Sequence, residues 1–457
     1  MRLRLVLLLL LPLFLIGCAS VSTTSMPSTT LHGNFEQADD YAQRLPSLPA
    51  NERAAAGRNI ERLLAGVPNG ELSSKSARLP ADDPLYRFAA RELRKRGLPL
   101  PRPMERGVAA GTANFPPADP DGYRPPGQLA VLLPISGTLS AAATSVRDGI
   151  FSAYFAENRR RPNVKVYDTA GTADGVRRAA TQAMADGAQM ILGPLTREEV
   201  GAIFNQTDID VPVIALNRGP VAPTPGNASF ALSPEEEGVV AADHLADRGS
   251  LNVFVISQHD DTAQRTLAAF REQLRARGGE IVAELAVDGG TMDAAALPQA
   301  VANAKSPPNA VFLALRATPA RMVAAQLATS AISALPRISS SLILSGGGNA
   351  RLDAGLDGIE LPALPWLLDQ RPLLPRPDEL AKTLPSARGP AQALFAFGMD
   401  AWMLAVYYDR LSSDPAFSIS GATGELRLDS FGTVQREPTW AVFSGGRPRA
   451  VAVAPTH

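Results

Sequence analysis

Apolar residues with helical spacing recur in the first part of the chain, from Asn34 to about Gly97. Three groups repeat at intervals of three and four residues: Phe35, Ala38, Ala42 and Leu45; Ala56, Ile60, Leu63 and Leu64; Leu85, Phe88, Ala89 and Leu93. Residues spaced in this way line one side of a helix, and the prolines between the groups end each helix. We therefore expect residues 34–97 to form a small all-α module of three or four short helices, without a clear 34-residue repeat.

After Gly127 the pattern changes to short apolar runs that alternate with amphipathic segments. The expected strands are Leu129–Leu133, Val164–Tyr167, Met190–Leu192, Val213–Leu216, Val253–Ser257, Ile281–Leu285 and Val311–Ala314. The expected helices are Ala141–Glu157, Gly175–Ala185, Arg197–Asn205, Glu235–Ala246, Thr262–Arg277 and Pro319–Ala328. Such alternation is typical of parallel sheets with helices on both faces. Residues 128–457 are too many for one such sheet, so this part is expected to be an α/β fold of two doubly wound lobes.

Two segments carry neither pattern. Residues 18–33 are small and rich in hydroxyl groups, and they are expected to form a flexible tether. Residues 98–127 are rich in proline, which favours an extended and semi-rigid linker between the helical module and the α/β part.

The first twenty residues have the pattern of an export signal. Arg2 and Arg4 precede the apolar run Leu5–Ile16, which is too short for a membrane span. The run ends in Leu15-Ile16-Gly17-Cys18, which resembles the lipobox of bacterial lipoproteins. Cys18 is the only cysteine of the chain, and it stands where a lipobox requires one. An ordinary signal peptide with a chance cysteine is the alternative.

The lipobox interpretation has two consequences. Residues 1–17 would be a lipoprotein signal peptide, and Cys18 would carry the diacylglycerol and palmitate chains. Ala19 and Ser20 follow the cysteine, with no Asp. This resembles the sorting signal of Gram-negative lipoproteins that reach the outer membrane, so we expect a lipid-anchored protein at its periplasmic face.

Composition excludes several classes of function. Of 457 residues, 44 are Lys or Arg and 45 are Asp or Glu, and this balance argues against a nucleic-acid partner. One cysteine cannot form a disulfide within the chain, and four histidines give no metal-ligand spacing. His259-Asp260-Asp261 is expected to be a solvated turn rather than a metal site. No hydrolase or kinase motif is present, so we expect no enzyme, no cofactor and no metal.

Segments in a fixed order along residues 128–445 resemble a known family. They are Leu129–Gly137, Val146–Gly149, Val166–Thr169, Ile191–Leu195, Val213–Asn217, Leu232–Glu235, Ala396–Asp400 and Gly421–Leu426, with Arg436 and Trp440. Together they are similar to the type 1 periplasmic binding-protein fold, and more narrowly to LpoA-type lipoproteins of the LppC family. About a hundred residues precede this region, whereas the family often has a longer helical array there.

The resemblance implies a function and a division of the chain. LpoA-type lipoproteins bind class A penicillin-binding proteins and activate peptidoglycan synthesis, which supports cell shape. By resemblance, lobe one would hold residues 127–232 and 361–410, and lobe two would hold 233–360 and 411–457. The alternative function is a lipoprotein receptor for amino acids or amides that feeds an ABC transporter.

Candidate ligand groups lie in the cleft between the lobes, where strands of open α/β sheets end. The candidates are Ser136, Thr138, Thr196, Asn217 and Asp260. The loop of Ser136 and Thr138 either holds an anion on backbone N–H groups or caps the following helix. Thr196 and Glu199 have the spacing of a capping box, which would leave few donors free for the carboxylate of an amino acid.

Overall fold

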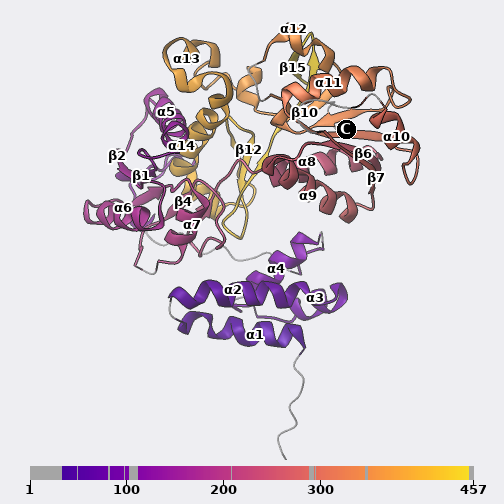
Figure 1. Ribbon diagram of the computed structural model, residues 1–457. Coiled ribbons are helices and arrows are strands. Elements are labelled where there is room, and N and C mark those ends of the chain that lie inside the picture. Colours follow the sequence, from indigo (N-terminus) through magenta and orange to yellow (C-terminus); the bar gives the residue numbers. More distant parts are fainter. Residues whose placement is uncertain are drawn as a thin grey trace, which may run out of the picture.

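Four helices form a separate layer at the start of the described chain. The computed structural model describes residues 33–451 except 49, 81–82, 97, 102–111, 207, 288–292, 294 and 345–347. The helices are α1 (Asn34–Arg44), α2 (Ala50–Ala65), α3 (Asn69–Ser76) and α4 (Tyr86–Lys95). Their apolar sides share one small core, which includes Phe35, Ile60 and Leu93. This layer lies below the two larger lobes in Figure 1, and it confirms the expected all-α module.

The first lobe is built on a five-stranded sheet in which every pairing is parallel. Its strands are β1 (Gln128–Leu133), β2 (Asn163–Asp168), β3 (Met190–Leu192), β4 (Val213–Ala215) and β5 (Ala228–Ser229), in the order β2-β1-β3-β4-β5. One face packs against α5 (Ser140–Ala156) and α14 (Gln392–Ser413). The other face packs against α6 (Ala173–Ala185) and α7 (Arg197–Phe204).

The second lobe is built on a seven-stranded sheet. Its strands are β6 (Asn252–Ser257), β7 (Glu280–Ala286), β8 (Ala310–Ala314), β9 (Arg337–Ser339), β10 (Ile359–Ala363), β14 (Thr439–Ser444) and β15 (Arg447–Ala450). β6 to β10 are parallel, and β14 and β15 add antiparallel strands at one edge. Helices α8 (Pro234–Asp247) and α9 (Asp261–Ala276) cover one face, and α10 (Ala296–Ala302) and α11 (Ala317–Ala328) cover the other. The expected pair of doubly wound parallel sheets is confirmed.

The chain crosses between the two lobes at other residues than the sequence predicted. All of β10 belongs to the second sheet, so the chain returns to lobe one after Ala363 rather than at 361. Strands β11 (Ile419–Ser420), β12 (Glu425–Leu428) and β13 (Val434–Glu437) form a small antiparallel sheet whose apolar side chains enter the core of the first lobe. Residues 411–437, which the sequence analysis assigned to lobe two, therefore pack with lobe one.

Helices α5 and α14 cross at two glycines. A Cβ atom on Gly149 would lie 2.0 Å from the carbonyl oxygen of Phe395, and one on Gly398 would lie 2.1 Å from that of Val146. Any larger residue at either position would push the helices apart. The two short helices α12 (Ala350–Asp353) and α13 (Pro377–Thr383) lie on the periphery of the molecule (Figure 1).

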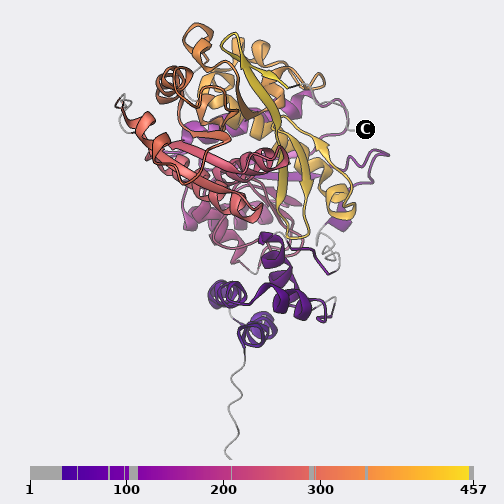
Figure 2. The same ribbon diagram turned by 90° about the vertical axis from the view of Figure 1, so that its right-hand side faces the viewer.

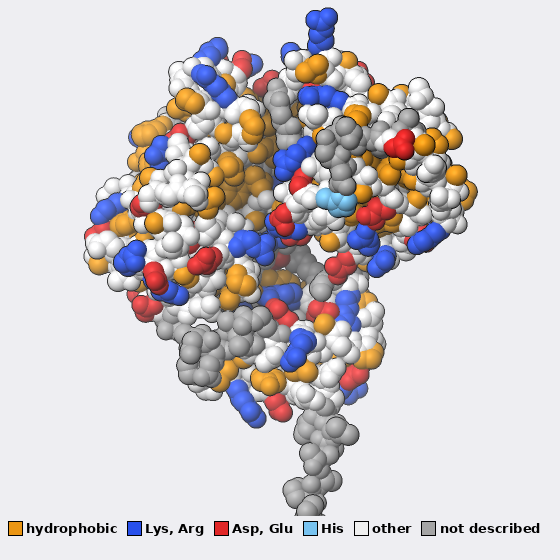
Figure 3. Space-filling model, in the orientation of Figure 1, with side chains coloured by type: hydrophobic (Ala, Val, Ile, Leu, Met, Phe, Trp, Pro, Cys, Tyr) orange, Lys and Arg blue, Asp and Glu red, His pale blue; other side chains and the backbone are white. Residues whose placement is uncertain are grey.

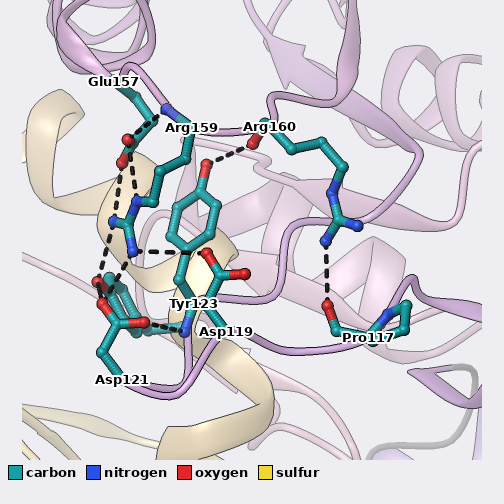
Figure 4. A network of polar contacts seen from close by, with 8 residues as sticks. Pro117, Asp119, Asp121, Tyr123, Glu157, Arg159 and Arg160 are labelled. Carbon is teal, nitrogen blue, oxygen red and sulfur yellow. Dashed lines mark hydrogen bonds and ion pairs between the residues drawn. The ribbon is translucent and has the colours of Figure 1, made fainter.

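The second half of the proline-rich linker is fixed to lobe one. Phe115 and Tyr123 are buried in the first core, and the Tyr123 hydroxyl donates to the carbonyl of Arg160 at 2.8 Å. Arg159 lies over the Tyr123 ring at 3.7 Å and pairs with Glu157 and Asp121 (Figure 4). The linker was expected to be only a spacer, but its aromatic side chains anchor it.

The helical module also contacts the lobes directly. Tyr86 and Ala90 of α4 pack against Phe431, at the tip of the β12–β13 hairpin. Arg87 donates to the carbonyl of Pro223 at 3.4 Å, and Arg91 lies over the Phe431 ring at 5.6 Å. Figure 2 shows the yellow strands of this hairpin running down toward the indigo helices. Helix α4 of the module therefore packs against the β12–β13 hairpin.

Candidate functional site

The structure brings four of the five candidate residues to one edge of the first sheet. Ser136 and Thr138 follow β1, Thr196 follows β3 and Asn217 follows β4, and these three strands are parallel. Asp260 follows β6 in the second sheet. The molecular surface is hollowed between the two lobes, as Figure 3 shows. The candidates thus lie at the carboxyl ends of strands, where such sheets place ligands.

Thr196 forms the predicted capping box. Its hydroxyl accepts a hydrogen bond from the backbone N–H of Glu199 at 3.2 Å, and its own N–H donates to the Glu199 carboxylate at 3.0 Å. Glu199 is fully buried, and its second carboxylate oxygen finds no hydrogen-bond partner among the described residues. The N–H groups of Thr196 and Glu199 are therefore used within the capping box and are not available to a ligand carboxylate.

Asn217 is also engaged within the protein. Its side-chain amide donates to the carbonyl of Leu195 at 2.8 Å, and its side-chain oxygen accepts from the backbone N–H of Arg218 at 2.8 Å. The side chain thereby connects the loop after β3 with the loop after β4. This role is structural.

Ser136 and Thr138 do not cap the following helix. Helix α5 begins at Ser140 behind Leu139, with no hydrogen bond from a side chain at its N-cap, so the predicted cap is wrong. The backbone N–H of Ser136 already donates to the Asp168 carboxylate at 3.2 Å. Burial raises the pKa of Asp168, but hydrogen bonds from Ser136 and Ala170 outweigh this and lower it overall.

Asp260 caps helix α9. Its carboxylate accepts from the backbone N–H of Ala263 at 2.9 Å and lies 3.1 Å from the guanidinium of Arg316. Burial acts to raise the pKa of Asp260, but the Ala263 N–H and Arg316 lower it overall. The predicted solvated turn is therefore a helix cap with an ion pair.

A charged cluster that the sequence did not predict lies at the junction of the lobes. Glu236, in the first turn of α8, pairs with Arg218 from the loop after β4. Arg436 of β13 lies 3.9 Å from the same carboxylate and is itself buried. Burial raises the pKa of Glu236, and the two arginines offset part of this effect. The cluster connects residues that are up to 218 positions apart, so no local spacing signals it.

Asp400 extends this junction cluster into the core. It is fully buried in α14 and accepts from the backbone N–H of Ala422 at 2.5 Å and from both the N–H and the hydroxyl of Thr423. Arg436 in turn donates to the carbonyl of Thr423 at 3.3 Å. Burial raises the pKa of Asp400 to about 6. Helix α14, the turn before β12 and strand β13 are thereby held together.

No group of three or more His, Cys, Asp or Glu side chains in the described part of the chain is arranged to hold a metal ion. None of the helices between residues 33 and 451, the gaps aside, is both long and apolar enough to cross a bilayer. Cys18 lies outside the described residues.

Known proteins resemble the chain over its lobes. Penicillin-binding protein activator LpoA of Haemophilus ducreyi is 27% identical over 321 residues, which cover 70% of this chain and 53% of the relative. The chain spans about half the length of the curated relatives it matches.

Solved structures also resemble the chain over its two lobes. The C-domain of LpoA from Haemophilus influenzae, described as a regulator of PBP1A, is 25% identical with a TM-score of 0.61, over 71% of this chain and all of that domain. A "putative branched-chain amino acid ABC transporter" of Chromobacterium violaceum is 28% identical with a TM-score of 0.57, over 69% and 99% of the two chains. The type 1 periplasmic binding-protein fold is thus confirmed.

The family model described as "LppC putative lipoprotein" matches residues 123–446. This match begins at the anchored end of the linker and includes both lobes and the junction cluster. The chain belongs to the LppC family of LpoA-type lipoproteins.

Proposed function

We propose that this protein binds a class A penicillin-binding protein and activates it, without being an enzyme itself. The relatives named as activators support this partner. We also propose that Cys18 anchors the protein in the outer membrane, with the lobes in the periplasm. An activator of this kind works by binding the active conformation of its partner more tightly than the inactive one.

The observation that carries the proposal is the bonding of Thr196 and Asn217 at the carboxyl edge of the first sheet. Thr196 and Asn217 use their donors and acceptors within the protein, and the buried Glu199 carboxylate lies behind Thr196. A receptor for amino acids needs unsatisfied donors that face the ligand's carboxylate. The bonds of Thr196 and Asn217 within lobe one occupy the Thr196 N–H and part of the Asn217 amide, which favours a regulator that acts through protein contacts.

Stimulation of a purified partner tests this function. Residues 34–457, without the lipid, are expected to increase peptide crosslinking by a class A penicillin-binding protein on lipid II substrate. The tether only raises the effective concentration of the lobes, so the soluble form acts at a higher dose. Product analysis by chromatography measures crosslinking, with an unrelated protein at equal concentration as the control. An unchanged product pattern at saturating dose would refute the proposal.

The second candidate, a solute receptor, is favoured by the likeness to the Chromobacterium protein. Titration calorimetry against the common amino acids distinguishes the two. We expect no tight binding, because Thr196 and Glu199 bond to each other in the capping box and two acids lie in the first turn of α7. A dissociation constant of about 1 μM or tighter, roughly −8 kcal/mol, would favour the receptor.

A further inference from the structure

An aromatic surface lies at the carboxyl end of helix α5. We call it the α5 patch and define it by Phe151, Tyr154, Phe155 and Arg161. Phe155 is 69% exposed, and it is the only phenylalanine among the five large hydrophobic side chains that are exposed in the described part of the chain. Aromatic side chains and arginine are enriched at protein interfaces relative to the rest of the surface.

The rings of the patch pack on one another, and Tyr154 packs on the core behind it. Tyr154 packs edge-on against the buried Trp402 of α14, with ring centroids 5.2 Å apart. Phe155 stacks with Phe151 at 6.0 Å and meets Tyr154 edge-on at 5.1 Å. Side chains fixed in this way lose little freedom when a partner covers them.

Arg161 gives the patch its charge. Its guanidinium lies 4.9 Å from the centre of the Tyr154 ring and 6.0 Å from that of Phe155. It donates to the carbonyl of Tyr154 at 3.4 Å, and no carboxylate of the described residues lies within ion-pair distance of it. The neighbouring acids are engaged elsewhere, because Glu157 and Asp121 both pair with Arg159 (Figure 4). The positive charge of Arg161 is therefore available to a binding partner.

We propose that the α5 patch docks the penicillin-binding protein, through a segment that places a carboxylate on Arg161 and an apolar side chain over Phe155. This inference rests on the proposed function. Aromatic rings and arginine are the residues that dominate binding at protein interfaces, and the unpaired guanidinium selects an acidic partner.

Two other occupants fit the patch less well. A second copy related by two-fold symmetry would place Arg161 close to the same arginine of its mate. An anionic membrane is bound by clusters of four to eight basic residues. Here Arg159 is neutralised by its acids, which leaves only Arg161 and its neighbour Arg160. A single acidic protein segment matches this small charge.

Affinity measurements with matched variants test the inference. Full-length lipidated protein in detergent is titrated against a purified class A penicillin-binding protein by biolayer interferometry. Phe155→Ser and Arg161→Glu are each expected to weaken binding about tenfold or more. The controls are Leu352→Ser, another exposed apolar residue, and Arg178→Glu, an exposed arginine of α6 in the same lobe. Both controls are expected to stay within about twofold of the parent affinity.

A photo-crosslinker gives an independent readout. p-Benzoylphenylalanine in place of Phe155 is expected to crosslink to the penicillin-binding protein on irradiation, and the same group in place of Leu352 is not. Because Phe155 is exposed, the substitution leaves the fold intact, and an unchanged melting temperature verifies this.

Each outcome decides between the alternatives. If the parent protein binds and both patch variants bind equally well, the docking surface is refuted while the proposed function stands. If the parent protein neither binds nor stimulates the enzyme, both are refuted. If the variants alter only self-association in gel filtration, a second copy occupies the patch and the proposal is wrong. If they alter only flotation with anionic vesicles, a membrane occupies it and the proposal is also wrong.

Discussion

Replacing Asp400 with Ala is expected to destabilise the lobes by about 3 kcal/mol, because buried donors then lose their acceptor. The N–H groups of Ala422 and Thr423 and the Thr423 hydroxyl all donate to this carboxylate. Thermal unfolding followed by circular dichroism is expected to show a melting temperature lower by roughly 6 °C or more. A melting temperature within 1 °C of the parent, about 0.5 kcal/mol or less, would show that the carboxylate is dispensable.

Asp400 also gives this stability a defined pH dependence. Its folded pKa of about 6 lies above the ordinary value of 3.8, so the folded protein holds the proton more tightly than the unfolded chain does. The extra stability that comes from the more tightly held proton is full below pH 3.8 and is lost as the pH rises through 6, whereas the hydrogen bonds to the carboxylate remain. A shift of about two units corresponds to about 3 kcal/mol.

Asp400→Asn, which cannot ionise, isolates this effect. As the pH rises from 4 to 7, the free energy of unfolding of the parent is expected to fall relative to that of this variant. Asp174→Asn is the control, because the Asp174 side chain is 80% exposed. A difference that stays constant over this range would contradict the raised pKa.

Local patterns predicted most of the regular elements. The capping box of Thr196 and Glu199 was found from spacing alone, because both members lie within one helical turn. The apolar strands of both sheets were found because parallel strands buried on two faces consist of nearly continuous hydrophobic runs. The loop of Ser136 and Thr138 was misjudged, because a hydroxyl before a helix indicates a cap only if the backbone turns it toward the helix.

Local patterns could not predict contacts between residues that are far apart in the sequence. The alternating side chains of β12 and β13 have the same spacing whichever lobe they pack against, so the third passage between the lobes was misplaced. Glu236 follows Glu235 and precedes Glu237 in a first helical turn, where acids ordinarily complement the helix dipole. Only the fold shows that Glu236 is the one that meets Arg218 and Arg436.

The largest effect in cells is expected from Cys18. A lipoprotein is anchored through a thioether on this sulfur, and no other residue of the chain carries a thiol. Cys18→Ala should therefore leave the protein soluble in the periplasm, or held by its uncleaved signal at the inner membrane. Sucrose-gradient fractionation measures this distribution, and Ser20→Ala is the matched control that keeps the lipidated residue.

Loss of the anchor should abolish function in cells without altering the lobes. An anchored activator is confined near its partner, and dilution into the periplasm removes that high effective concentration. Purified Cys18→Ala protein without its signal should still stimulate the enzyme at a high dose, because Phe115 and Tyr123 fix the linker to lobe one independently of the lipid. Complementation of a strain that lacks the protein measures the loss. Full complementation together with outer-membrane fractionation of Cys18→Ala would overturn the role of this residue.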